Sequence, residues 1–174
     1  LARQILALRL ETTPFLKKAP NERKIAVISK PIKGNFLTVQ GQPVFKHPEI
    51  HQLYEYSLKN IPKSVVQSIL ALPRPTLIAD LEHAFLDTVI RYKYFQELDW
   101  DDDTCNFMVH ALYLLTEHRS YRSLPVILDF LRQDEGFREF WVADWLETYF
   151  KAPLYILGEN QLSVLKDFAL EENL

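Results

Sequence analysis

From His47 to the end of the chain, apolar residues recur at every third or fourth position, the spacing that places side chains on one face of an α-helix. The longest stripe of this kind consists of Leu77, Leu81, Phe85 and Val89, with charged residues between them. It predicts an amphipathic helix of about five or six turns over residues 76–97. Shorter helices are expected over residues 47–60, 63–72, 104–118, 123–133, 137–150 and 162–170.

The first 46 residues follow a different pattern. The segments KIAVIS (24–29) and NFLTV (35–39) are rich in β-branched and aromatic residues, and KPIKG separates them, as in a β-hairpin. An isolated hairpin is marginal in water, so this one must dock on another part of the protein. We therefore predict an all-α domain over residues 47–174, preceded by an N-terminal arm, residues 1–46, into which a short β-hairpin fits.

Two stretches of the predicted helical domain share one layout. The segments LYLLTEHRSYRSLPVILDFLRQDEGF (112–137) and LYILGENQLSVLKDFALEENL (154–174) each contain an aliphatic helix end, a polar link, a second aliphatic run and an acidic patch. The offset between them is 42 residues at the first aliphatic run and about 38 at the second. Two-helix solenoid repeats have periods close to these values. We interpret each stretch as part of a repeating unit.

The residues of one such unit resemble a known repeat. The stretch ALYLLTEHRSYRSLPVILDFLRQDEGFREFWVADWL (111–146) is similar to a HEAT-like unit, with Pro125 at the second helix and an acidic turn before the next one. The resemblance covers about residues 62–174 and points to an uncharacterised bacterial family of HEAT-like proteins of unknown function. It implies an α-α superhelix of antiparallel helix pairs, with about six to eight helices in all. The sequence departs from the common pattern at Glu117, where the next unit has Gly158.

Composition agrees with this fold class. The 174 residues include only four glycines but ten prolines, which suits helices separated by proline breaks. The single cysteine, Cys105, excludes an internal disulfide and lies on a predicted apolar helix face, where we expect it to be buried. No apolar run is long enough to cross a bilayer, and the start LARQILALRLE is too short and too charged for a secretion signal. The use of a single cysteine fits a reducing compartment, so we expect a cytoplasmic protein.

Charge is distributed unevenly. The arm holds nine Lys or Arg against two acidic residues, a net charge of +7, whereas residues 47–174 carry a net charge of −10. Basic arms can bind nucleic acids, and Lys17, Lys18, Arg23 and Lys24 are the candidate polyanion-binding residues. The acidic helical domain would repel phosphates, so nucleic acid is the less favoured partner. The alternative is that the arm lies on the acidic body of its own chain.

The acidic run Asp101, Asp102 and Asp103 lacks the glycine and the closing glutamate of a calcium-binding EF-hand loop. Because it stands directly before a predicted helix, we expect residues 101–104 to cap that helix. Asp80, His83 and Asp87 share one helix face and could ligate a metal, although a solvated charged stripe is the simpler interpretation.

One enzymatic alternative comes from the resemblance. Some HEAT-like proteins are dimetal hydroxylases that use paired His-Glu dipeptides, and Glu82-His83 and Glu117-His118 lie 35 residues apart in this chain. The order is reversed here and only two pairs occur, so the ligands would point in other directions around their helices. The sequence contains no glycine-rich phosphate loop and no nucleophile motif. We expect no cofactor and nominate no catalytic residue.

The favoured function is therefore a non-catalytic protein–protein interaction or scaffold module. Aromatic residues that the core does not need would contact the partner, and Trp100, Trp141 and Trp145 are the candidates. Helix pairs of a solenoid leave their ends open, so copies of the chain could also join through an open end or through the arm.

Overall fold

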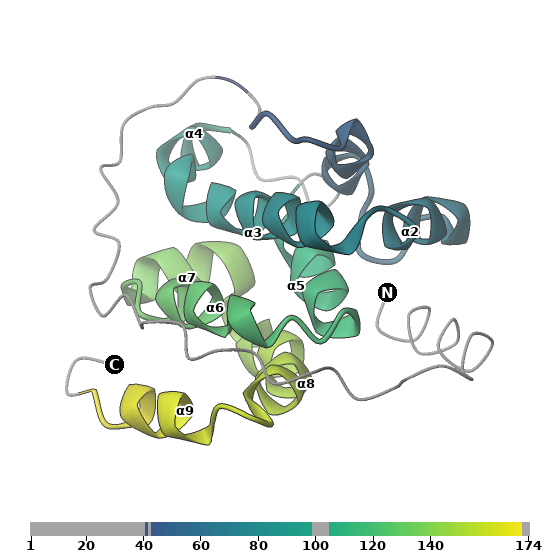
Figure 1. Cartoon of the computed structure of the whole chain (residues 1–174). Coiled ribbons are helices and arrows are strands. Elements are labelled where there is room, and N and C mark those ends of the chain that lie inside the picture. Colours follow the sequence, from purple (N-terminus) through teal and green to yellow (C-terminus); the bar gives the residue numbers. More distant parts are fainter. Residues whose placement is uncertain (1–40, 42, 99–104, 172–174) are drawn as a thin grey trace.

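The computed structural model describes residues 41, 43–98 and 105–171, and these residues are helical apart from their connecting turns (Figure 1). The prediction of an all-α fold is confirmed for this part of the chain. Its elements are η1 (Pro48–Tyr54), α2 (Lys63–Leu70), α3 (Arg74–Ile90), α4 (Tyr92–Glu97), α5 (Phe107–Glu117), η2 (Tyr121–Ser123), α6 (Leu124–Leu131), α7 (Glu135–Val142), η3 (Ala143–Trp145), α8 (Leu146–Gly158) and α9 (Leu162–Ala169), where η marks a 3-10 helix.

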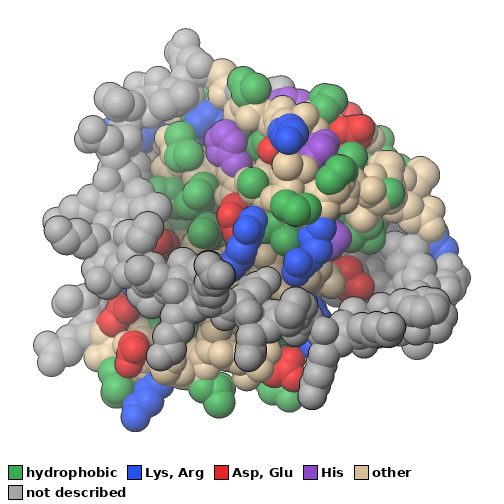
Figure 2. Space-filling model, in the orientation of Figure 1, with side chains coloured by type: hydrophobic (Ala, Val, Ile, Leu, Met, Phe, Trp, Pro, Cys, Tyr) green, Lys and Arg blue, Asp and Glu red, His purple; other side chains and the backbone are tan. Residues whose placement is uncertain are grey.

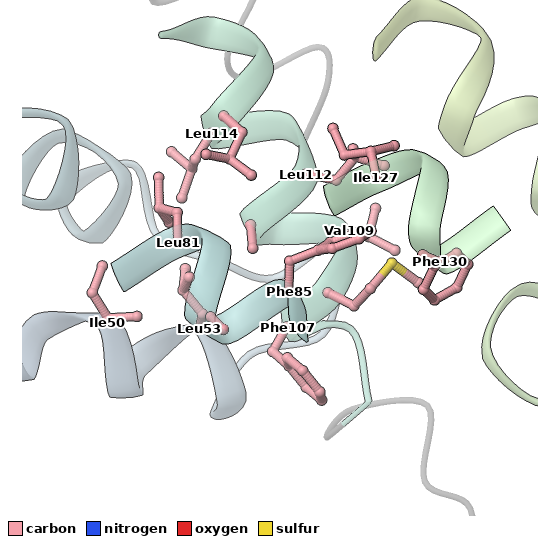
Figure 3. Packing of buried hydrophobic residues seen from close by; sticks show 14 of the residues in the cluster. Ile50, Leu53, Leu81, Phe85, Phe107, Val109, Leu112, Leu114, Ile127 and Phe130 are labelled. Atoms are coloured by element: carbon pink, nitrogen blue, oxygen red, sulfur yellow. The ribbon is translucent and has the colours of Figure 1, made fainter. Parts of the chain in front are cut away.

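The helices follow one another in space roughly in chain order. In Figure 1 the colours run from blue at the top, through α3 and α5 in the middle, to yellow α9 at the bottom. The core lies where α3 packs against α5, which is the most extensive contact between two helices. Figure 3 shows apolar side chains of η1, α3, α5 and α6 meeting there: Ile50, Leu53, Leu81, Phe85, Phe107, Val109, Leu112, Leu114, Ile127 and Phe130.

Polar contacts between successive parts of this stack join residues about 40 positions apart. Three pairs connect α3 and α4 to the segments after α5 and α6, with separations of 41 to 44 residues: Arg74 with His118, Glu82 with Ser123, and Tyr92 with Gly136. Three more connect the segment 119–132 to the α8–α9 region, with separations of 39 to 40 residues: Arg119 with Glu159, Tyr121 with Gln161, and Arg132 with Glu171. The two segments predicted to be equivalent therefore lie next to each other.

Several helix boundaries differ from the prediction. The predicted helix 76–97 is two helices, because the backbone leaves α-helical geometry at Arg91 (φ −108°, ψ 22°). The helix expected from residue 104 begins at Phe107 with Asn106 at the N-cap position, and the predicted capping run 101–104 lies outside the described residues. Pro125 does stand in the first turn of α6, where its missing N–H costs no hydrogen bond.

The predicted single helix over 137–150 is also wrong. It consists of α7, η3 and α8, and the break occurs at Ala143, whose φ of +39° is unfavourable for a residue with a Cβ. Asp134 caps α7, since its side chain accepts a hydrogen bond from the backbone N–H of Phe137 (2.9 Å). The acidic turn that follows α6 therefore also begins the next helix.

The end of the predicted arm is anchored on the helical body. Phe45 is buried against the rings of His51 and His83 at centroid distances of 4.9 and 5.5 Å. The backbone N–H groups of Lys46 and His47 donate to the two oxygens of the Asp80 carboxylate, at 3.0 and 2.8 Å. The rest of the arm, with the predicted β-hairpin, lies outside the described residues.

His110 of α5 makes stability depend on pH. Its side chain is fully buried, and burial lowers its pKa from 6.5 to about 4, although a hydrogen bond between Nε2 and the carbonyl of Tyr56 (2.9 Å) opposes the shift. A carbonyl accepts only, so the neutral imidazole carries its proton on Nε2. Protonation would add a buried N–H at Nδ1, which has no hydrogen-bond partner among the described residues.

We expect the folded state to lose about 3 kcal/mol through His110 as the pH falls from 6.5 to 4, since the unfolded chain binds the proton in this window and the folded chain does not. The replacement His110→Gln keeps a donor for Tyr56 but cannot be protonated. Urea unfolding at several pH values should therefore show a shallower decline for the variant than for the wild type between pH 6.5 and 4. Parallel curves would contradict the assignment.

Candidate functional site

A pocket of about 220 Å³ lies between the start of α3 and the link from α5 to α6. Its lining combines Arg74, Pro75 and Ile78 of α3 with the link residues 119–122. Three of the lining side chains are arginines, and we call this site the arginine pocket: Arg74, Arg119 and Arg122. Figure 2 shows Lys and Arg side chains near the centre of the drawn face, beside hydrophobic and acidic ones.

Local sequence explains how α3 presents its end to the pocket. Pro73 occupies the N-cap position and Pro75 lies in the first turn, where a proline is tolerated because that turn has no upstream hydrogen-bond partners. The first turn of α3 has no acidic residue, and Pro73 offers no side-chain cap. The positive end of the dipole of this 17-residue helix is therefore not offset by a carboxylate of its own first turn.

The other wall is shaped by the end of α5. Ser120 donates its backbone N–H to the carbonyl of Leu115 (3.0 Å), which is the six-residue closure of a Schellman motif. Arg119 occupies the left-handed position of this motif with a φ of +47°, where glycine is the usual residue. A non-glycine residue costs about 1 kcal/mol there.

The three arginines have few strong partners within the described residues. Arg74 donates from Nη2 to the backbone carbonyl of His118 (3.1 Å). Arg119 contacts Glu159 (3.2 Å) through side chains that are 37% and 58% exposed, and Nε of Arg122 lies 3.9 Å from Glu82. Exposed ion pairs of this kind contribute about 0 to 1 kcal/mol, so a ligand can replace them at low cost.

One further donor is free. The Nε atom of Arg119 is buried and has no hydrogen-bond partner among the described residues. The pKa of Arg119 is raised, chiefly by its hydrogen bond to the Tyr121 hydroxyl, so the guanidinium stays charged. Burial lowers the pKa of the neighbouring His118, with a contribution from the charge of Arg74, so this imidazole is neutral at pH 7. The positive charge of the pocket therefore comes from its arginines.

The hydroxyl groups of two serines near the pocket take part in buried hydrogen bonds. Ser123 is fully buried and donates to Glu82 (2.5 Å), and its oxygen lies 2.8 Å from that of Ser120, which is 2% exposed. Neither serine is accessible as a nucleophile, and no histidine stands within hydrogen-bonding distance of either in the contacts of the described residues. The arrangement can hold an anion through charge and N–H donors, which is binding chemistry.

The sequence-predicted contact residues are dispersed. Trp100 and the four basic residues Lys17, Lys18, Arg23 and Lys24 lie outside the described residues. Trp145 is 59% exposed and stacks on Tyr149, so it stays available to a partner.

Trp141 requires a correction, because it is a core residue. It is 4% exposed and packs edge-to-face on Phe95 and Phe107 at centroid distances of 5.1 and 5.6 Å. Residues four apart on one continuous helix would share a face. The backbone break at Ala143 separates them, so that one ring points into the core and the other into solvent.

The residues considered for metal binding serve separate structural contacts. Asp80 accepts the backbone N–H groups of Lys46 and His47, and Asp87 is paired with Arg91. His83 packs its ring on Phe45. Within residues 41, 43–98 and 105–171, no group of three or more His, Cys, Asp or Glu side chains is arranged to hold a metal ion, and this includes the two Glu-His dipeptides.

Sequence reasoning missed the arginine pocket. Arg74 lies 45 positions before Arg119, and neither belongs to a recognised motif. The available signals were weak: an arginine between two prolines at a helix start, and the segment HRSYR (118–122), in which Arg119 follows the end of a predicted helix where glycine is common.

Two further findings bear on function. No helix among the described residues combines the length and the apolar character that crossing a bilayer requires. No protein-family model, curated protein or solved structure matches this chain.

Proposed function

We propose that this chain is a non-catalytic protein–protein interaction module, built from HEAT-like helix pairs, that receives an anionic group of its partner in the arginine pocket. The observation that carries the proposal is that three of the seven residues lining one pocket are arginines: Arg74, Arg119 and Arg122. Arginine is the residue best suited to fixing carboxylate or phosphate groups, because its planar guanidinium offers five N–H donors.

The arrangement of the helices supports the repeat architecture. Six polar contacts from α3 onward span 39 to 44 residues, which is near the repeat length expected for two-helix units. The contacts of the segment 46–54 with α3 span 29 to 34 residues. The pocket is formed where two successive segments of this stack meet, since Arg74 precedes the 118–122 link by one such interval. Solenoid proteins commonly bind partners on the surfaces that their stacked units create.

The lining of the pocket supports binding over catalysis. An acid–base or nucleophilic mechanism needs an accessible group whose proton can move near neutral pH. The guanidinium groups keep their charge, and Ser120 has its hydroxyl buried. What the pocket offers a ligand is fixed positive charge and hydrogen-bond donors.

Affinity capture with the full chain tests the proposal. The wild type, the double variant Arg74→Gln/Arg119→Gln and the control Lys151→Gln, which removes one exposed positive charge elsewhere, are used as baits in nuclease-treated extract of the source cells. Lys151 is 76% exposed on α8, where it pairs with Glu147 of the same helix. We expect one stoichiometric protein partner, retained by the control and reduced at least about tenfold by the double variant, because each charged hydrogen bond contributes about 1.5 to 3 kcal/mol.

The same experiment can overturn the proposal. Equal capture by the wild type and the double variant would show that the pocket does not bind the partner. Retention of the bound material only before nuclease treatment would instead assign the interaction to nucleic acid. Circular dichroism melting of both baits checks that Arg74 and Arg119, which lie at the surface and the pocket rim, were replaced without unfolding the chain.

A further inference from the structure

Two carboxylates among the described residues are each bound by one arginine through two hydrogen bonds. Asp87 accepts two hydrogen bonds from Arg91, at 2.6 and 2.5 Å, and Glu171 accepts two from Arg132, at 2.7 and 2.6 Å. This bidentate geometry uses both carboxylate oxygens. The arginine pocket is lined by three arginines, so a ligand with three terminal oxygens offers each of them an oxygen, whereas a carboxylate has only two oxygens.

We infer that the arginine pocket binds a phosphoryl group, carried as a phosphomonoester on a side chain of the partner protein; this inference rests on the proposed function. A phosphomonoester has three terminal oxygens and a charge of about −1.5 to −2 at pH 7. Clusters of arginines are a recurring means of recognising phosphorylated residues in proteins. Arg74 reaches the group from α3, and Arg119 and Arg122 reach it from the opposite wall.

Carboxylates of the chain itself compete with a ligand for the arginines of the pocket. Glu159 contacts Arg119, Glu82 lies near Arg122, and Glu117 also acts on Arg119 electrostatically. A ligand carboxylate would only replace the exposed Glu159 with a group of the same charge, which yields little net attraction. A phosphoryl group carries more negative charge than the single carboxylate it would displace. Its attraction to the arginines is therefore stronger than that of a ligand carboxylate.

The end of α3 adds to this preference. Arg74 and Pro75 are its first residues, and its first turn carries neither a side-chain cap nor an acidic residue. Pro75 has no N–H, and the N–H groups of Thr76 and Leu77 already donate to the carbonyl of Pro73, so the end of α3 acts on a phosphate through its positive dipole. The contribution of the dipole adds to that of the three guanidinium groups and rises with the charge of the ligand.

Arg119 permits a test in which stability and binding change in opposite directions. Its φ of +47° is relaxed by glycine, so Arg119→Gly should raise the melting temperature by about 2 to 4 °C. The same substitution removes one guanidinium from the pocket. A residue with only a structural role in the turn would not weaken ligand binding when it is replaced by the residue that the turn prefers.

The experiment titrates the full chain with capped peptides of glycine and alanine around one central phosphoserine, glutamate or serine, and with inorganic phosphate. Isothermal titration calorimetry gives the affinities, and ¹H–¹⁵N spectra of the arginine Nε–H groups report which arginines respond. We expect the phosphoserine peptide to bind at least about tenfold more tightly than the glutamate peptide. Arg119→Gly should weaken this binding at least about tenfold, and Lys151→Gln should change it less than about twofold.

Lowering the pH from 7.5 to 5.5 should also weaken the binding of the phosphoserine peptide. The second pKa of its phosphate is about 6, so the phosphate loses negative charge in this range, whereas the arginines do not titrate in it. Equal affinities for the phosphoserine and glutamate peptides would overturn the phosphoryl inference and leave the proposed function intact. Inorganic phosphate binding as tightly as the peptide would overturn the assignment to a protein-borne group. Binding of the phosphoserine peptide that Arg119→Gly leaves unchanged, or no binding of any probe, would overturn the site.

Discussion

Replacing Asp87 by alanine is expected to lower the free energy of unfolding by about 3 to 5 kcal/mol, the range observed when one partner of a buried ion pair is removed. The side chains of Asp87 and Arg91 are 2% and 4% exposed, and the pair is linked by two hydrogen bonds of 2.6 and 2.5 Å. Loss of the carboxylate leaves the guanidinium charge buried without a counterion.

A third group increases the cost. Tyr54 of η1 donates its hydroxyl to Asp87 (3.0 Å), and burial raises the pKa of this phenol, so it remains a donor at all ordinary pH values. Asp87 therefore joins η1 to α3. Arg91 also lies over the ring of Phe95, with its guanidinium carbon 4.9 Å from the ring centre. These contacts place the charged pair at the junction of three elements.

Chemical denaturation of Asp87→Ala, Arg91→Met and the double variant provides the measurement. We expect the double variant to lose less than the sum of the two single losses, because it leaves no unpaired charge. The matched control is Glu147→Ala, which breaks the exposed pair with Lys151 and should produce no measurable change. A loss below about 1 kcal/mol for Asp87→Ala would contradict the buried pair.

Replacing Phe130 by alanine is expected to cost about 3 to 5 kcal/mol, as for other large aromatic residues in protein cores. Phe130 of α6 is 1% exposed and contacts a ring from each of three other helices. Its centroid lies 5.3 Å from Phe85 of α3, 5.1 Å from Phe137 of α7 and 5.3 Å from Phe150 of α8. The cavity would therefore open where four helices meet.

A comparison of two substitutions of different size at Phe130 distinguishes the loss of packing from other effects. Phe130→Leu removes less volume and should cost clearly less than Phe130→Ala, with an unchanged dependence of unfolding on urea concentration. Tyr155→Ala is the surface control, since Tyr155 is 82% exposed, and its effect should stay within about 0.5 kcal/mol. Similar losses for Phe130→Ala and Tyr155→Ala would show that Phe130 is not at the centre of the core.

Part of the fold could be read from local pattern. The stripe of Leu77, Leu81, Phe85 and Val89 is buried along α3, as its periodicity predicted. The helix expected from residue 104 begins at Phe107, so Cys105 lies just before it. Cys105 is nevertheless buried, as expected. Such features follow from sequence because side-chain spacing and proline geometry act within a few residues of one another.

Helix breaks were harder to foresee. Ala143 has no special propensity for a positive φ, yet the chain bends there and separates Trp141 from Trp145. The aromatic contacts of Trp141 with Phe95 and Phe107 come from segments far away in the chain. Packing of the Trp141 ring against these distant residues outweighs the local preference for a continuous helix. The spacing of residues within one segment does not reveal such contacts.

The residue types and helical periodicity of this chain were enough to establish that its second part is helical and which faces are buried. They did not reveal the arginine pocket, because Arg74 meets the 119–122 link only after helices about 40 residues apart have stacked. Spacing within a helix follows from covalent geometry, whereas the convergence of charges across helices follows from burial of apolar surface over the whole chain.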